Sequence, residues 1–133
     1  MVVILRLLWP ESTLSPNERH HWSVVSRAKK RYRTACWLLA LEQKRGQRLP
    51  RPPLRLRMTF CPPARSRNRE RHDRDNLNAR MKSGIDGVCT ALEIDDSVFV
   101  EVASRRGAPR GDGEVLFEIE TDETNDASGG ATT

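Results

Sequence analysis

Hydrophobic and polar positions along the chain follow two periods, and each period predicts a kind of element. Apolar residues crowd into 2–9, where a proline follows, and they occupy every second position of 54–61, LRLRMTFC, before two further prolines. A short apolar run and a period of two are both typical of strands. We therefore predict a strand over each segment, the second with one buried and one polar face.

A helical period governs the segment 22–43, where apolar residues recur every three or four positions. A second face of this helix carries Arg27, Lys30 and Arg31. We predict an amphipathic helix with a basic side. Its start is open, because the SPNE stretch at 15–18 fits either a capping box or a structured turn before a helix that begins near Trp22.

The second predicted helix spans 76–92, where an apolar stripe again follows the helical period. Gly84 and Gly87 each cost this helix up to about 1 kcal/mol relative to alanine, so we expect a packing contact to require them. Alternation returns in 97–104 and in 114–121, with a glycine-rich basic loop between them. We predict that these two segments are strands and form a hairpin.

The predicted order β-α-β-α-β-β indicates an α+β fold, a mixed sheet with two helices packed on it. One domain over 1–121 accounts for all periodic segments of the 133-residue chain. Residues 122–133 are polar and poor in hydrophobics, so we expect a disordered tail.

The net charge of +5 favours a polyanionic partner, with nucleic acid as the first candidate. Three scattered cysteines, Cys36, Cys61 and Cys89, indicate reduced thiols rather than a disulfide or zinc framework. The apolar first ten residues are too short to span a bilayer and lack a cleavage site, so we expect no membrane association and a cytoplasmic location.

Two acidic motifs flank the second predicted helix. Asp73 and Asp75 lie two positions apart just before it, inside RHDRDNLNARMK, and in extended chain they point to the same side. Asp95 and Asp96 follow it, and adjacent strand residues point to opposite faces, so one of this pair joins a shared site. The site requires the chain to fold back after the helix. Hard oxygen ligands of this kind suit Mg²⁺ or Mn²⁺, and solvated surface ion pairs are the alternative.

Cations surround the first acidic motif. The arginines of ARSRNRERHDRD fall at every second position, which fits either a phosphate-contacting arm or a solvated loop. Lys82, two turns beyond Asp75 on the predicted helix, is the first candidate to stabilise charge on a scissile phosphate, and Arg80 is the second.

These residues carry a family resemblance. RHDRDNLNARMKSGIDG followed by EIDDSVFVEV resembles the RusA family of Holliday junction resolvases, found in phages and prophages, and LSPNERHHWSVVSRAKKRYR is similar to the phage-type members. The resemblance covers residues 1–121. It implies a RusA-like fold and a homodimeric, Mg²⁺-dependent endodeoxyribonuclease, with Mn²⁺ as a substitute ion, that cuts four-way DNA junctions by paired nicks.

Carried over by motif, the resemblance implies that Asp73, Asp75 and Asp96 bind the metal and act in catalysis, with Asp95 as a further metal ligand. The family lysine four residues past the second aspartate corresponds here to Ala79. Lys82 keeps the K-x-x-x-D spacing with Asp86 and is the expected substitute.

Candidate DNA contacts come from the basic segments and from the phage-type motif. They are Asn17, Arg19, Lys30, Arg31, Arg65, Arg67, Arg69, Arg71 and Arg80. The histidines His20 and His21 are expected at the surface or in a helix cap. We expect Trp9, Trp22 and Trp37 in the core, because base stacking needs exposed rings. The alternative function is a basic nucleic-acid-binding module with a resolvase-like fold and no catalysis.

Overall fold

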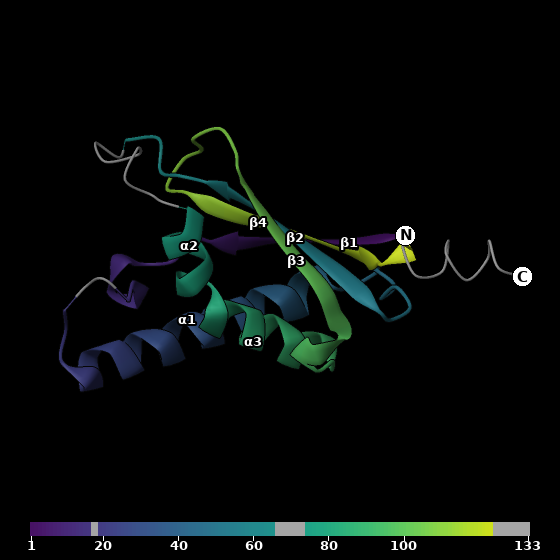
Figure 1. The fold of residues 1–133 in the computed structure, drawn as a ribbon, viewed down its shortest axis with the longest axis horizontal. Coiled ribbons are helices and arrows are strands. Elements are labelled where there is room, and N and C mark those ends of the chain that lie inside the picture. Colours follow the sequence, from purple (N-terminus) through teal and green to yellow (C-terminus); the bar gives the residue numbers. More distant parts are fainter. Residues whose placement is uncertain (17–18, 66–73, 124–133) are drawn as a thin grey trace, which may run out of the picture.

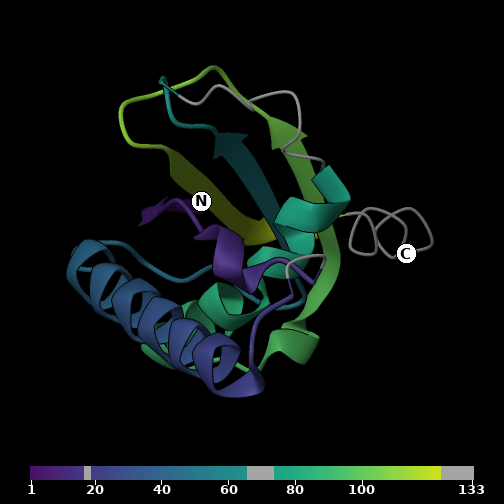
Figure 2. The same ribbon diagram turned by 90° about the vertical axis from the view of Figure 1, so that its left-hand side faces the viewer.

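A four-stranded mixed sheet carries helices α1, α2 and α3 on one face, as two perpendicular views show (Figures 1 and 2). The computed structural model describes residues 1–16, 19–65 and 74–123, with the backbone alone for 74–76. The expected α+β class with a mixed sheet is confirmed. In chain order the elements are β1 (Val2–Leu8), η1 (Ser12–Leu14), α1 (Trp22–Gln43), β2 (Leu54–Cys61), α2 (Arg74–Arg80), α3 (Lys82–Leu92), η3 (Asp96–Val98), β3 (Phe99–Arg106) and β4 (Glu114–Thr121).

The core lies between the sheet and the helices, where the period of two in the strands meets the helical period of α1. On β1, β2 and β4, every second residue faces the helices and is buried. From α1, the small side chains Ala28, Cys36 and Ala40 and the ring of Tyr32 complete the layer. Each fully buried large aliphatic side chain contributes roughly 1.5–3 kcal/mol. This burial fixes the side of α1 that faces the sheet, and the basic side therefore faces water.

The strand order β1-β4-β2-β3 corrects the predicted hairpin. β2 lies between β3 and β4 and pairs with β3 in parallel and with β4 antiparallel. The inner residues of β4 are completely buried, whereas Val100 and Val102 of β3 are about half exposed. The more apolar strand therefore takes the central position, and β3 takes the edge. Parallel pairing of β2 and β3 is possible because helices connect them.

The predicted single helix over 76–92 is two helices, α2 and α3, which meet at Met81. The amide of Met81 is shared between the carbonyls of Leu77 and Asn78, at 3.1 and 3.2 Å, which is the geometry of a tightened last turn. Met81 itself is fully buried, and its sulfur accepts a hydrogen bond from the Tyr32 hydroxyl. The break lets α2 contact η1 and β3 while α3 packs along α1.

Close contact between α1 and α3 depends on the two glycines of α3, as predicted. A β-carbon at position 84 would lie 2.6 Å from the Tyr32 ring, and one at position 87 would overlap the backbone carbonyl oxygen of Arg33. Real β-carbons essentially never approach so closely. Gly84 and Gly87 therefore allow the two helix backbones to touch.

The first edge of the sheet is closed by side chains from the end of α1 and from the turn that follows it. The amide of Gln47 bonds both the N–H and the carbonyl of Ile4, at 2.9 and 3.0 Å, and that of Gln43 does the same for Arg6, at 2.6 and 2.7 Å. These bonds satisfy the outward backbone groups of β1, which would otherwise offer a template for another strand. The opposite edge strand, β3, exposes Val100 and Val102, and β1 also exposes Val2, Ile4 and Leu8.

The tryptophans depart from the core prediction. Trp9 is half-buried and packs edge-to-face on Phe60, with ring centroids 6.3 Å apart. Trp22 is 75% exposed and Trp37 is 37% exposed. Both are therefore exposed, and the core prediction is wrong for Trp22 and Trp37.

Two further expectations concern the C-terminal tail and association with membranes. Residues 124–133, most of the predicted tail, lie outside the described residues. Across the described ranges, no helix is both long and apolar enough to cross a membrane.

We expect Gly87→Ala to lower the free energy of unfolding by about 1–3 kcal/mol, because the new methyl group meets backbone that cannot rotate away. At an unobstructed helical position the same change would stabilise the protein by up to about 1 kcal/mol. The sign of the change in the free energy of unfolding therefore shows whether the methyl group meets the α1 backbone. Urea unfolding measures the difference. Thr90→Ala, at an exposed position of the same helix, is the control and should stay within about 0.5 kcal/mol of wild type. Unchanged or increased stability for Gly87→Ala would contradict the contact.

Candidate functional site

The first acidic motif falls at the start of α2, and the structure describes it in part. Asp73 belongs to 66–73, outside the described residues. Asp75 lies in the first turn of α2, where the backbone alone is described. The convergence of these two carboxylates with the downstream pair therefore stays a prediction.

The downstream pair follows a sharp reversal of the chain at the end of α3. Glu93 adopts a left-handed conformation with φ 57°, and the next amide, of Ile94, bonds back to the carbonyl of Cys89 at 3.0 Å. This is the hydrogen bond of a helix that ends and turns back. Asp95 then caps η3, since its carboxylate accepts a bond from the Ser97 amide at 2.9 Å. The chain therefore turns back after α3 before it enters β3, and the approach of Asp95 and Asp96 to Asp73 and Asp75 stays a prediction.

Asp95 and Asp96 interact, and their pKa values move in opposite directions. The bond from the Ser97 backbone amide, with help from the Ser97 side chain, lowers the pKa of Asp95. A hydrogen bond shared with Asp95 raises the pKa of Asp96; reduced hydration and the negative charges of Asp95 and Asp86 act in the same direction, and Lys82 opposes them. Both carboxylates are exposed. The pair therefore carries crowded negative charge that a bound cation would relieve.

Lys82 and Asp86 lie one turn apart on α3 and within the electrostatic reach of this pair. The same carboxylates affect buried Cys89. Burial raises the pKa of its thiol to about 12, and the negative charges of Asp96, Asp86 and Asp95 add to the rise. The positive charge of Lys82 thus reaches the downstream carboxylate of Asp96.

The donor chemistry of these side chains fits a hard divalent cation only in part. Carboxylate oxygens are the ligands that Mg²⁺ prefers. Among the side chains that the structure describes, however, no three His, Cys, Asp or Glu residues gather closely enough to hold a metal ion. Asp95 and Asp96 would supply one side of such a site, and Asp73 and Asp75 would have to complete it.

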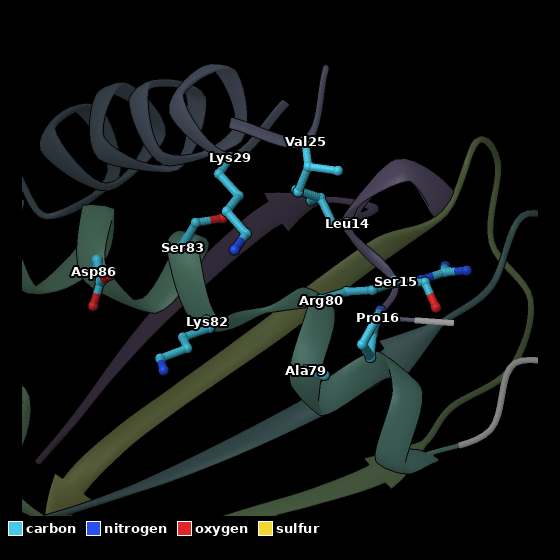
Figure 3. A pocket seen from close by; sticks show the side chains of 10 residues that line it. All are labelled: Leu14, Ser15, Pro16, Val25, Lys29, Ala79, Arg80, Lys82, Ser83 and Asp86. Carbon is cyan, nitrogen blue, oxygen red and sulfur yellow. The ribbon is translucent and has the colours of Figure 1, made fainter. Parts of the chain in front are cut away.

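A hollow of about 440 Å³ opens between η1, α1 and the α2–α3 junction (Figure 3). Arg80 lines it and is 9% exposed, with its guanidinium near the carbonyl of Pro10 at 3.5 Å. This predicted DNA contact therefore points into the hollow rather than outward. Ala79, at the position of the family lysine, lines the same hollow, and Lys82 lies at its rim.

The predicted basic arm leaves the sheet beside the loop between β3 and β4. Backbone bonds of 2.9 Å join Ala64 to Gly111 and Arg110 to Pro62. Arg65 is exposed at the base of the arm. The arginines of the arm itself, Arg67, Arg69 and Arg71, lie outside the described residues, as does Asn17.

The remaining predicted contacts lie on or just before α1. Arg19 and Lys30 are exposed, and Arg31 forms an ion pair with Glu11 at 2.9 Å. His21 caps α1 through its ring nitrogen, as expected, and the helix begins at Trp22 rather than at the SPN stretch.

Sequence reasoning missed a second hollow, of about 660 Å³, between α1 and α3. Lys29 and Arg33 line it together with Trp22, and these residues are spaced by seven and four positions, which places them on one helical face. That spacing was visible in the sequence. The sequence did not show, however, that Trp22 is exposed.

No family model matches the chain. The chain is 38% identical over 128 residues to an uncharacterized protein of Xylella fastidiosa (strain Temecula1 / ATCC 700964). The match covers 95% of this chain and 80% of that relative, so it includes α1 and the whole α2–α3 segment. The chain therefore belongs to the same family as this Xylella fastidiosa protein.

Proposed function

We propose that the protein is a Mg²⁺-dependent, structure-selective endodeoxyribonuclease that resolves four-way DNA junctions by paired nicks. One observation carries the proposal: the chain turns back at Glu93 after α3 and presents Asp95 and Asp96 at the surface, where the charges of Asp86 and Lys82 reach Asp96. The DxDN motif opens α2 at the other end of the same helical segment. The resemblance of both motifs to the RusA family supports the proposal.

In this proposal Asp73, Asp75 and Asp96 hold the metal, and Asp95 orients the loop through its cap on Ser97. A bound Mg²⁺ supplies an activated water and polarises the phosphodiester. Lys82, exposed at the start of α3, stabilises negative charge on the scissile phosphate.

The charge of the protein supports DNA as the substrate. The net charge is +5, and exposed cations follow α1 and the base of the arginine arm. Phosphate contacts of this kind position DNA without reading its sequence. Selectivity for a junction would then come from the arrangement of the basic surfaces.

Paired nicking needs two active sites, so the proposal includes a homodimer. The two edges of the sheet differ in a way that supports this. Glutamine side chains occupy the outward backbone groups of β1, whereas β3 presents Val100 and Val102, 53% and 52% exposed. We propose that β3 contributes to the dimer interface.

The second candidate is a non-catalytic module that holds nucleic acid. Two observations favour it: Ala79 stands at the position of the family lysine, and the described side chains alone form no three-ligand metal group. In this alternative the aspartates balance local charge, and their removal leaves DNA binding intact or stronger.

Asp75→Asn and Asp96→Asn are each expected to reduce Mg²⁺-dependent cleavage of a synthetic four-way junction by at least about 100-fold, because each removes a charge that acts on the metal. Binding of the junction should persist. Gel assays of cleavage and binding on the same variants measure both. Asp112→Asn, in the exposed β3–β4 loop, is the matched control. Cleavage at the wild-type rate by Asp75→Asn would exclude the site.

Lys82→Ala tests whether this residue takes the role of the family lysine. We expect the single-turnover cleavage rate to fall about 10²–10³-fold, the scale of one lost transition-state contact. Arg45→Ala removes the same charge from an exposed position and should leave the rate nearly unchanged. Equal effects of the two substitutions would assign Lys82 to general electrostatic attraction.

Sedimentation equilibrium is expected to give twice the 15.2 kDa mass of one chain at micromolar concentration. Val102→Asp should shift the protein toward monomer, because the new charge cannot be buried against a second copy. Val24→Asp, at an exposed position of α1, should remain dimeric. A monomeric wild type would contradict junction resolution, although single nicking would remain possible.

A further inference from the structure

The hollow between α1 and α3 continues into the neighbouring one and forms a single groove. Val25, Lys29, Ser83 and Asp86 line both parts, whose volumes are about 660 and 440 Å³. In Figure 3, Lys29 from α1 and Ser83 from α3 point toward one another across the gap. The groove lies between α1 on one side and η1 with the α2–α3 segment on the other.

An exposed indole stands at the first turn of α1, at one end of this groove. Trp22 is 75% exposed, although large aromatic rings are normally buried for most of their area. Its neighbour His21 is held by the Ser23 amide and hydroxyl, at 3.2 and 2.7 Å, and lies against the indole with centroids 5.5 Å apart. The ring therefore stands beside a fixed neighbour and offers apolar surface to solvent.

The cations along the groove are available to a ligand. Lys29, Lys30 and Arg33 are exposed and form no ion pair with any residue in the described ranges. By contrast, Arg31 on the adjacent face is paired with Glu11. Asp86 is the sole carboxylate that lines the groove among the described residues.

A polar atom in the wall also lacks a partner. The hydroxyl oxygen of Ser83 is buried and forms no hydrogen bond within the described part of the protein. Buried polar atoms in native proteins are usually satisfied, so this hydroxyl is suited to a ligand oxygen. It lies in the α3 wall of the groove, on the side that faces Lys29.

We infer that this groove binds an unpaired stretch of nucleic acid, with one base stacked on Trp22 and the backbone phosphates on Lys29, Lys30 and Arg33. Stacking of a base on an aromatic ring inside a positively charged groove is the recurring way to hold single strands without reading sequence. Paired bases inside a duplex have both faces covered, so the indole selects unstacked nucleotides. Trp22 and Arg33 would also suit a protein interface, but three unpaired cations beside a single carboxylate favour a polyanion.

The inference rests on the proposed function in one respect, that the partner is nucleic acid. It needs neither metal nor the aspartates. Binding measured in EDTA therefore tests the groove separately from cleavage. If Asp75→Asn leaves cleavage unchanged, the proposed active site is wrong, but the groove can still bind single strands. If the groove does not bind single strands, this inference is wrong, but the proposed active site is unaffected.

Fluorescence anisotropy of a labelled oligothymidylate in EDTA tests the indole. Trp22→Ala is expected to weaken binding about 5- to 150-fold, which corresponds to the ~1–3 kcal/mol of one stacked base. Trp22→Phe should recover most of the affinity, and duplex binding should change less than about twofold. Trp37→Ala, further along α1 and 37% exposed, is the matched control and should bind as wild type.

Salt dependence tests the cations. Lys30→Gln combined with Arg33→Gln should reduce the slope of log affinity against log salt by about 1.4, since each phosphate contact on a single strand contributes about 0.7. Arg48→Gln combined with Arg51→Gln removes the same charge from exposed positions outside the groove and should leave the slope unchanged. Equal slopes for the two pairs would overturn the inference.

An abasic oligonucleotide separates stacking from phosphate attraction. It should bind wild type and Trp22→Ala equally, because it offers no base to the ring. The contrary result is that Trp22→Ala binds both normal and abasic strands with wild-type affinity, while its mass in sedimentation differs from that of wild type. The ring then belongs to an interface between copies of the chain, and the inference is wrong.

Discussion

The contact between α1 and α3 is the constraint on which the rest of the structure depends. Gly87 lets the α3 backbone reach the carbonyl of Arg33, and Gly84 leaves room for the Tyr32 ring. Once the two helices touch, the orientation of α3 is determined, and Lys82 and Asp86 face the groove and the downstream aspartates. The contact thereby places Lys29 and Arg33 of α1 and Asp86 of α3 in the walls of one groove.

The crossover between β2 and β3 carries every residue of the proposed active site. Parallel pairing of these strands requires a connection along one face of the sheet, and α2 and α3 provide it. The DxDN motif stands where the crossover enters α2, and the Asp95–Asp96 pair stands where it returns to β3. Both acidic motifs are therefore attached to one structural unit, whose packing against α1 and whose break at Met81 decide how far apart they lie.

The regular elements could be predicted from the sequence because their periods are clear, as in LRLRMTFC and in the apolar repeat of α1. The need for small residues at positions 84 and 87 was also readable, since glycine in a helix requires compensation. The prediction of a hairpin between β3 and β4 failed because local alternation does not distinguish an edge strand from a central one. The difference is visible only in the folded sheet, where Phe117 is buried and Val102 is exposed. The exposure of Trp22 was hidden for the same reason. Cap geometry, such as the turn at Glu93 that redirects Asp95, depends on backbone angles that residue types alone do not specify.

We propose that the turn after α3 returns an aspartate to a metal shared with the DxD motif. Anomalous diffraction from a crystal soaked in Mn²⁺ tests it most directly, because the ion is located without reference to activity. The account predicts one manganese peak per subunit bounded by carboxylates of Asp73 or Asp75 and of Asp95 or Asp96. No bound manganese, or an ion held by the Asp95–Asp96 pair alone with Asp73 and Asp75 turned into solvent, would contradict it.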